Sequence, residues 1–418
     1  MNEQTASKVP QIRFKGFEGE WEEKTFEQNI ISIQTGTNLL GTTSGKGTPL
    51  LKMGNIQRGY FSLERLEALD ARAEVEAENI AHYGDFLFNT RNTLDLVGKG
   101  ATWMGESGKF AFNSNLARFK FKGIDTVFFN YLYNTQSLVS QVKARAMGTT
   151  SVAAVYPQSL NSLEYKLPTS EEQTQIGEYF RILDSLIGLH QRKHDKLLTL
   201  KKAMLQKMFP QPGATTPEIR FKGFSGEWEL CELSEITTKI GSGKTPKGGK
   251  TGYLTSGIPL IRSQNIFSDT VNFEGIAFIS DEADEEMSNS RVLQNDVLLN
   301  ITGASIGRSA VYRSVERANV NQHVCIIRAS GDYHSDFIQL NLASTRGQAA
   351  IDNSQAGGAR EGLNFQQIGK FSFQFPPHTE QQKIGTYFRQ LDSLISKHAT
   401  QLQKLQQIKS ACLEKMFV

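Results

Sequence analysis

The chain has 418 residues, 39% hydrophobic content and a formal net charge of +3, a composition that fits globular domains and excludes a low-complexity chain. The mild basic balance permits nucleic acid as a partner without demanding it. Three scattered cysteines (Cys231, Cys325 and Cys412) exclude a disulfide framework and a zinc-finger spacing. No apolar signal core opens the sequence and no run approaches a membrane span, so we expect a cytoplasmic protein without a membrane partner.

Two long segments occur twice. Residues 10–22 read PQIRFKGFEGEWE and residues 217–229 read PEIRFKGFSGEWE, a shift of 217 − 10 = 207 positions. Residues 172–209 begin EQTQIGEYFRILDSLI, residues 380–417 begin EQQKIGTYFRQLDSLI, and both end in KMF, a shift of 380 − 172 = 208. The stretches between these segments are much less alike. The pattern predicts a duplicated domain and a duplicated helix, in which a fixed frame carries two variable inserts.

Both inserts contain short apolar runs separated by Gly, Asn and Ser, which predicts an irregular α+β module with mostly β structure. The runs occur in the same order in the two inserts. They are PLLKMGN (49–55), GDFLF (84–88) and residues 110–121 in the first insert, and PLIRSQN (259–265), NDVLL (295–299) and residues 320–328 in the second.

A long helix is predicted after each insert. Ser170 with Gln173, and Thr379 with Gln382, have the spacing of a capping box. Apolar residues then recur at heptad positions, which predicts an antiparallel coiled coil of the two helices, with a histidine in each stripe. The predicted seam consists of Ile176, Leu183, His190 and Leu197 in the first helix, and Ile384, Leu391, His398 and Leu405 in the second. A second heptad position carries Tyr179, Leu186 and Leu200, and Tyr387, Leu394 and Ile408.

Three prolines and a glycine within residues 210–217 exclude helix and central strand there and mark a linker. The predicted organisation is an N-terminal segment (1–19), a first domain (20–167), a helix (168–209), the linker (210–226), a second domain (227–375) and a C-terminal helix (376–418). We expect two pseudo-symmetric domains joined by the two helices.

No catalytic or metal-binding constellation is found. GSGKT (241–245) lacks the first glycine of a phosphate-binding loop and is followed by Pro246. The only Pro-Pro pair (376–377) leads into a helix, and Glu164 and Lys166 lack the partner acid of a nuclease site. The seven histidines form no metal cluster. We therefore expect no enzyme activity, catalytic residue or metal in this chain.

Polar loops rich in Arg, Asn, Thr and Ser follow matched strands in both halves. Such side chains contact base edges and phosphates, although each loop alone also fits an ordinary turn. The predicted DNA-contacting residues are Lys46, Arg91, Asn92, Lys99, Thr149 and Ser151 in the first half, and Lys244, Thr302, Ser305, Arg308, Gln322 and Arg360 in the second.

The helix signature EQQKIGTYFRQLDSLI at residues 380–395, its counterpart at residues 172–187 and the two Gly-Glu-Trp entries resemble the specificity subunit of bacterial type I restriction-modification systems. The resemblance covers essentially the whole chain. It implies two target recognition domains that each read a half-site of double-stranded DNA, with the paired helices setting the spacing. It further implies two docked methylation subunits, associated restriction subunits, and S-adenosylmethionine, ATP and magnesium on those partners and none on this chain.

A second hypothesis remains open. A scaffold that binds two partner proteins without reading DNA would have the same duplication and the same coiled coil. Exchange of one insert discriminates between the two hypotheses, because only a DNA reader would change the recognised sequence.

Overall fold

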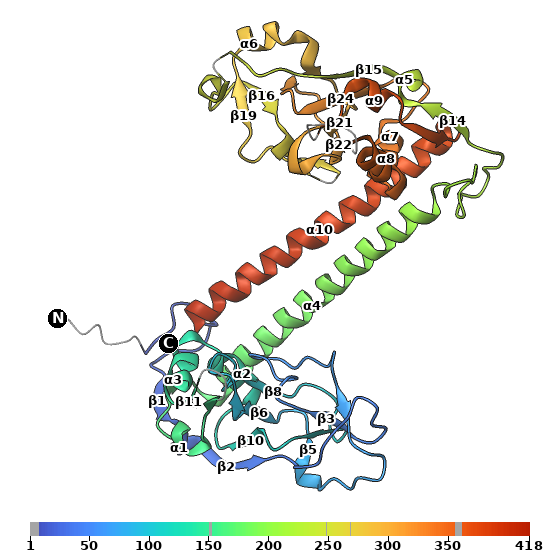
Figure 1. Ribbon diagram of the computed structural model, residues 1–418. Coiled ribbons are helices and arrows are strands. Elements are labelled where there is room, and N and C mark those ends of the chain that lie inside the picture. Colours follow the sequence, from blue (N-terminus) through green and yellow to red (C-terminus); the bar gives the residue numbers. More distant parts are fainter. Residues whose placement is uncertain (1–7, 150–152, 248, 268, 356–361) are drawn as a thin grey trace. The chain divides into compact units, whose positions relative to one another are not determined.

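The computed structural model describes residues 8–149, 153–247, 249–267, 269–355 and 362–418. The chain divides into two compact units (Figure 1). Unit 1 contains the residues up to Gln191 together with Thr400–Val418, and unit 2 contains Arg192–Ala399. Each unit thus combines one insert with one part of each long helix.

Unit 1 is built on two four-stranded sheets. The first sheet has the order β2 (Ile30–Thr35), β10 (Leu116–Phe121), β6 (Phe86–Asn89), β8 (Gly100–Thr102), and all its pairs are antiparallel. The second has the order β4 (Glu67–Ala68), β3 (Pro49–Leu51), β9 (Phe110–Phe112), β5 (Ile80–Ala81), with β3 and β9 parallel. Smaller sheets pair β1 (Glu22–Thr25) with β13 (Glu164–Leu167), and β11 (Met147–Gly148), β12 (Ala153–Ala154) and β7 (Arg91–Asn92). The helices are α1 (Phe26–Asn29), α2 (Thr126–Tyr133) and α3 (Gln136–Ala144).

Unit 2 repeats this topology. Its antiparallel sheet has the order β15 (Thr237–Ser242), β24 (Val324–Ala329), β21 (Val297–Asn300), β22 (Ser309–Val311). Its mixed sheet has the order β19 (Ala277–Ile279), β16 (Ile258–Ile261), β23 (Ala318–Val320), β20 (Arg291–Val292), with β16 and β23 parallel. Two-stranded sheets pair β14 (Glu229–Glu232) with β25 (Ser372–Phe375), and β17 (Ile266–Phe267) with β18 (Thr270–Val271). The helices are α5 (Leu233–Ile236), α6 (Asp281–Glu286), α7 (Ser335–Ala343), α8 (Thr345–Gln355) and α9 (Phe365–Gly369).

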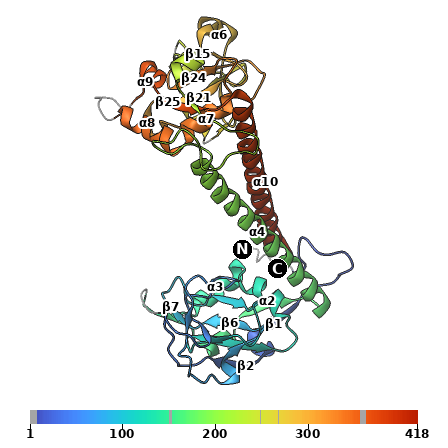
Figure 2. The same cartoon turned by 90° about the vertical axis from the view of Figure 1, so that its right-hand side faces the viewer.

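The two predicted long helices are α4 (Ser170–Lys207) and α10 (His378–Met416), with 38 and 39 residues. In unit 1, α2 lies between the antiparallel sheet and the first turns of α4 (Figure 2), where Phe129 contacts Phe86 and Tyr131 contacts Phe180. The apolar core of unit 1 also includes Met416 from the end of α10. In unit 2 the roles are exchanged, because α10 begins in the core and α4 ends there. Two mixed modules with long helices therefore confirm the predicted fold class.

The repeated KMF segments complete both cores. In unit 1, Phe417 packs against Trp21, with 6.3 Å between the ring centroids, and the amide of Ile12 donates to the carbonyl of Lys415 at 3.0 Å. The same junction recurs in unit 2. There Phe209 packs against Trp228 at 6.4 Å, and the amide of Ile219 donates to the carbonyl of Lys207 at 2.8 Å. In each unit, the segment that begins PQIRF or PEIRF thus contacts the end of a KMF segment. These two equivalent contacts explain structurally why both segments are repeated.

Ion pairs join α4 to α10 within each unit. In unit 1, Lys409 Nζ lies 2.5 Å from Asp184. In unit 2, Lys201 Nζ lies 2.6 Å from Asp392 and also pairs with Asp269. The Lys201 side chain is only 13% exposed. Lys201 therefore belongs to the contact between the two helices.

The predicted capping boxes at the helix starts are wrong. The Gln173 side chain donates to the Pro168 carbonyl at 3.0 Å and accepts from the Asp125 amide at 3.0 Å. In the second helix Gln381, and not Gln382, has this role, donating to the Pro376 carbonyl at 2.8 Å and accepting from His334. Each glutamine fastens the helix start to the preceding strand and to the helix of the module, which a local spacing rule cannot detect.

The predicted seam residues lie at graded depths. Ile176, Leu183, Ile384 and Leu391 are buried, and His190, Leu197, His398 and Leu405 are partly exposed. At the second heptad position, Leu186 and Leu200 are 38% exposed and Leu394 is 45% exposed. The heptad pattern predicts a buried stripe at this position, and the structure shows that it is not buried along its length.

Candidate nucleic-acid interface

Polar residues of unit 1 line a cavity of about 320 Å³ where the ends of β2, β7 and β12 meet the loop before β10. Its lining consists of Thr35, Asn38, Thr90, Arg91, Ser114, Asn115, Ala154, Val155, Tyr156 and Pro157. Backbone bonds fix the walls, since the amide of Thr90 donates to the carbonyl of Asn115 and the amide of Val155 donates to that of Thr90, each at 3.0 Å. Arg91 and Tyr156 are exposed at its edge. A polar, concave surface with an exposed arginine suits contact with base edges and phosphates.

A hydrogen-bonded chain of side chains lies at the corresponding strand ends of unit 2. The Thr245 hydroxyl donates to Gln322 Oε1 at 2.7 Å, and Gln322 Nε2 lies 3.1 Å from His323 Nε2. His323 Nδ1 lies 2.5 Å from the Thr302 hydroxyl. Within this hydrogen-bonded series, the Gln322 side chain is exposed and the His323 side chain is half-buried. The amide and imidazole are thereby held in defined orientations, as a base-reading group requires.

The predicted residues of the first half separate into two places. Arg91 and Asn92 form β7, which pairs with β12 and through it with β11, and Thr149 directly follows β11. Lys99 lies elsewhere, donating to Gln57 at 2.7 Å, and burial, followed by the nearby Arg58 charge, lowers its pKa. Exposed Lys46 sits in a loop whose neighbouring Gly47 amide donates to Leu69 at 2.9 Å, beside β4. Arg91, Asn92 and Thr149 are thus brought together, and Lys99 and Lys46 are not.

In the second half, Thr302 and Gln322 share the hydrogen-bonded chain, and exposed Lys244 adjoins Thr245. The Ser305 hydroxyl accepts from buried Asn300 at 3.1 Å, so it supports the loop. Arg308 is exposed just before β22. Ser151 and Arg360 lie outside the described residues.

Sequence reasoning missed Asn38, Asn115, Thr245 and His323, which the structure places in the two clusters. The available signal was the internal repeat itself. Asn115 and His323 each stand two residues after an asparagine that directly follows a matched strand, Asn113 after β9 and Asn321 after β23.

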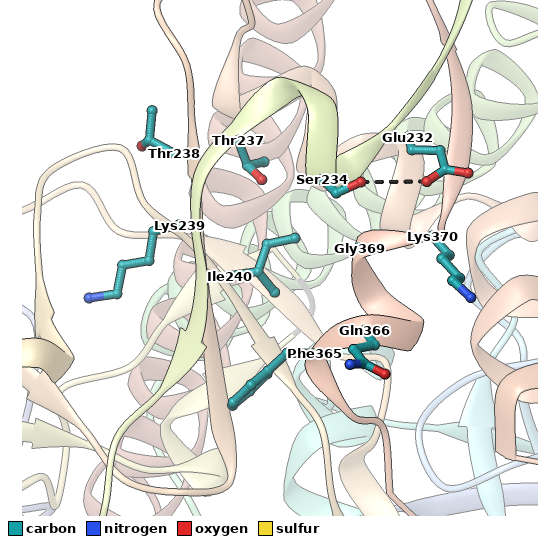
Figure 3. Close-up of a pocket in the computed structure, with 10 residues that line it drawn as sticks. All are labelled: Glu232, Ser234, Thr237, Thr238, Lys239, Ile240, Phe365, Gln366, Gly369 and Lys370. Atoms are coloured by element: carbon teal, nitrogen blue, oxygen red, sulfur yellow. Dashed lines mark hydrogen bonds between the residues drawn. The ribbon is translucent and has the colours of Figure 1, made fainter.

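A larger hollow of about 650 Å³ lies elsewhere in unit 2, between β15, α5 and α9 (Figure 3). Glu232 accepts from the Ser234 hydroxyl at 3.5 Å, and Phe365 and Gln366 come from α9. Lys239 is engaged with the Asn289 carbonyl, and burial, followed by the Arg328 charge, lowers its pKa. Among the predicted contact residues that the structure describes, none lines this hollow.

Among the described residues, no group of three His, Cys, Asp or Glu side chains is arranged to hold a metal ion. Within the same part of the chain, α4 and α10 have the length of a membrane span, but no helix is also apolar enough to cross a bilayer.

The comparisons with known proteins agree on one class of protein. Residues 225–407 match the family "Type I restriction modification DNA specificity domain". The type I restriction enzyme MjaX specificity subunit of Methanocaldococcus jannaschii is 22% identical over 92% of this chain and 90% of its own length. The EcoBI specificity subunit of Escherichia coli is 30% identical over 39% of this chain and 35% of its own length. The crystal structure of a type I restriction-modification S subunit from M. genitalium aligns with a TM-score of 0.59 at 17% identity, covering 98% of this chain and 99% of that one.

The duplicated modules and the two long helices give this chain the fold of that S subunit. The chain is similar, over most of its length, to the specificity subunits of type I restriction-modification systems, as the resemblance of its helix signature predicts. A specificity subunit is the non-catalytic component, which confirms the expectation that this chain is not itself an enzyme.

Proposed function

We propose that this chain is the DNA-reading subunit of its complex, with one half-site of a bipartite, asymmetric target read by each module. The single observation that carries the proposal is the duplicated frame, which consists of the equivalent contacts between each module and the long helices. Arg13 and Trp21 in unit 1, and Arg220 and Trp228 in unit 2, make equivalent contacts with the helix segments. Polar clusters of different composition stand on that frame at equivalent strand ends. A duplicated frame with two unlike polar surfaces suits a target with two unlike halves.

Direct reading requires side chains in the major groove and separate phosphate contacts that set the register. Arg91 and Gln322 are of the residue types that make bidentate contacts to guanine and adenine. Exposed Lys46, Lys244 and Arg308 supply charge for phosphates. The continuous helices α4 and α10 suit a spacer of fixed length, and half-sites about one DNA turn apart, ~34 Å, would present the same face of the duplex.

We further propose that two methylation subunits dock on this chain and that restriction subunits join them. S-adenosylmethionine, ATP and magnesium would be bound by those partners, in the bacterial cytoplasm where the DNA lies. The modest net charge of +3 suits a subunit that relies on its partners to enclose the DNA.

The test is an insert exchange. Residues 20–165 are replaced by the corresponding insert of another specificity subunit, and the DNA methylated by the assembled complex is sequenced. The proposal predicts that one half-site changes, the other half-site and the spacing stay the same, and assembly survives. An unchanged methylated sequence would refute the proposal and favour the alternative, a scaffold for two partner proteins.

A further inference from the structure

The strand registers align the two modules residue by residue. Leu116 pairs with Asn89 in unit 1, and Val324 pairs with Asn300 in unit 2. On the neighbouring strand, Ala117 pairs with Thr35, and Cys325 pairs with Ser242. Counting from these pairs, Asn38 corresponds to Thr245, Ser114 to Gln322 and Asn115 to His323.

Backbone hydrogen bonds on a neighbouring segment identify the fourth pair of corresponding residues. The amide of Thr90 donates to the carbonyl of Asn115 at 3.0 Å, and the amide of Ile301 donates to that of His323 at 3.1 Å. The next residues, Arg91 and Thr302, each form a bridge to a following segment. Arg91 therefore corresponds to Thr302.

The scaffold around these four positions is the same in both modules. Gly36 corresponds to Gly243, and a Cβ at these positions would lie 2.0 Å from the carbonyl oxygen of Phe112 and 1.6 Å from that of Val320. Neither position tolerates a side chain while the strands stay in place. Asn89 corresponds to Asn300, and both are fully buried. The two units are thus matched at these glycines and asparagines.

The four surface positions on this scaffold all differ. Unit 1 has Asn38, Arg91, Ser114 and Asn115, and unit 2 has Thr245, Thr302, Gln322 and His323. All eight side chains are exposed or half-buried. At these four positions the two modules therefore carry different polar side chains on matched strands.

We propose that these four matched positions determine the base preference of each half-site, which deepens the proposed function and rests on it. Arg91 has a planar fork that can pair with O6 and N7 of a guanine, and Thr302 at the same place in unit 2 cannot do this. Gln322 and Asn115 have amides that suit the N6 and N7 edge of adenine. The two modules therefore place a different donor and acceptor pattern at one common location.

The first test uses Arg91→Thr and Thr302→Arg, each of which gives one module the other's residue. The chain is assembled with its methylation subunits and the methylation rate is measured on a duplex library in which both half-sites are varied. Arg91→Thr should lower discrimination at one position of the first half-site by about ten-fold or more and leave the second half-site unchanged. Thr302→Arg should alter the second half-site only.

Arg91→Lys separates base reading from phosphate binding. It keeps the charge and loses the fork, so discrimination should fall while the salt dependence of binding stays the same. Lys109→Thr is the matched control, because Lys109 is an exposed cation of the same module that pairs with Glu106 at 2.9 Å. The control should leave the preferred sequence unchanged.

Unchanged preferences in both exchange variants would overturn the proposal, as would a loss of methylation that is equal on all duplexes with assembly intact. If a single variant does not assemble, all four positions of the first module are exchanged together, as Asn38→Thr, Arg91→Thr, Ser114→Gln and Asn115→His. An unaltered first half-site in that variant would also overturn the proposal. The insert exchange keeps the two proposals apart. If that exchange changes a half-site and the four positions do not, only the assignment of the four positions fails.

Discussion

The guanidinium of Arg13 holds the carboxylate of Glu172 in a two-point pair across 159 residues of chain. Nε and Nη2 each lie 2.7 Å from a carboxylate oxygen, and Nη1 donates to the Gly19 carbonyl at 2.6 Å. The Glu172 side chain is 0% exposed, and the hydrogen bonds that Arg13 donates to Glu172 raise the pKa of Arg13. Arg220 and Glu380 repeat the arrangement at the same distances in unit 2.

Loss of Arg13 should destabilise unit 1 selectively. Arg13→Met leaves Glu172 buried without a counter-charge, which costs about 3–5 kcal/mol. Domain-resolved hydrogen exchange should show faster opening of unit 1 and unchanged protection in unit 2. Arg13→Met combined with Glu172→Gln should recover part of the loss, because no buried charge then remains. Equal loss in the single and double variants would contradict the pairing.

Removal of Phe209 tests the second junction. Its side chain is 5% exposed, and its ring lies 5.2 Å from Phe337. Phe209→Ala should lower the stability of unit 2 by about 3 kcal/mol, measured by urea denaturation. Phe365→Ala is the matched control, because Phe365 in the same unit is 42% exposed, and it should change stability by less than about 0.5 kcal/mol.

Acid should weaken unit 2 through His334. Burial lowers the pKa of His334 below its usual 6.5, and His378, Arg313 and Arg389 lower it further. The unfolded chain then binds the proton more readily, so stability falls as the pH drops through about 6.5. Asp336, 3.7 Å from the ring, opposes the effect without reversing it. Urea midpoints between pH 8 and pH 5 should decline less steeply in His334→Asn, and parallel declines would argue against this cause.

The salt dependence of DNA binding should distinguish residues that contact phosphates from residues that read bases. If Lys46 contacts a phosphate, Lys46→Ala should reduce the slope of log affinity against log salt by about 0.9 without changing the methylated sequence. The measurement is duplex binding by the assembled complex from 50 to 200 mM salt. Lys109→Ala should leave the slope as it is. A changed sequence preference in Lys46→Ala would place this lysine among the reading residues instead.

The frame was predictable because its signals are local and long. Heptad spacing indicates helices at residues 168–209 and 376–418, and α4 and α10 lie within those ranges. The glutamine contacts at the helix starts were not predictable, because Gln173 and Gln381 bond to module residues far away in the sequence. The contact of Lys201 was not predictable for the same reason, since its partner Asp392 is on the other helix.

The candidate site was only partly predictable. Residue type and loop position select Arg91, Thr302 and Gln322, which the structure places at the strand ends. The same criteria select Lys99, which faces Gln57, and pass over His323, whose role depends on contacts with Thr302 and Gln322. Only the strand register brings the matched positions of the two halves into correspondence.

The most direct test of the account is to map all methylated sites in cells that contain this chain with its methylation subunits. The account predicts one bipartite sequence with two different half-sites and a spacer of fixed length, absent from cells without the chain. A single uninterrupted site, two identical half-sites, or methylation that is the same without this chain would contradict it.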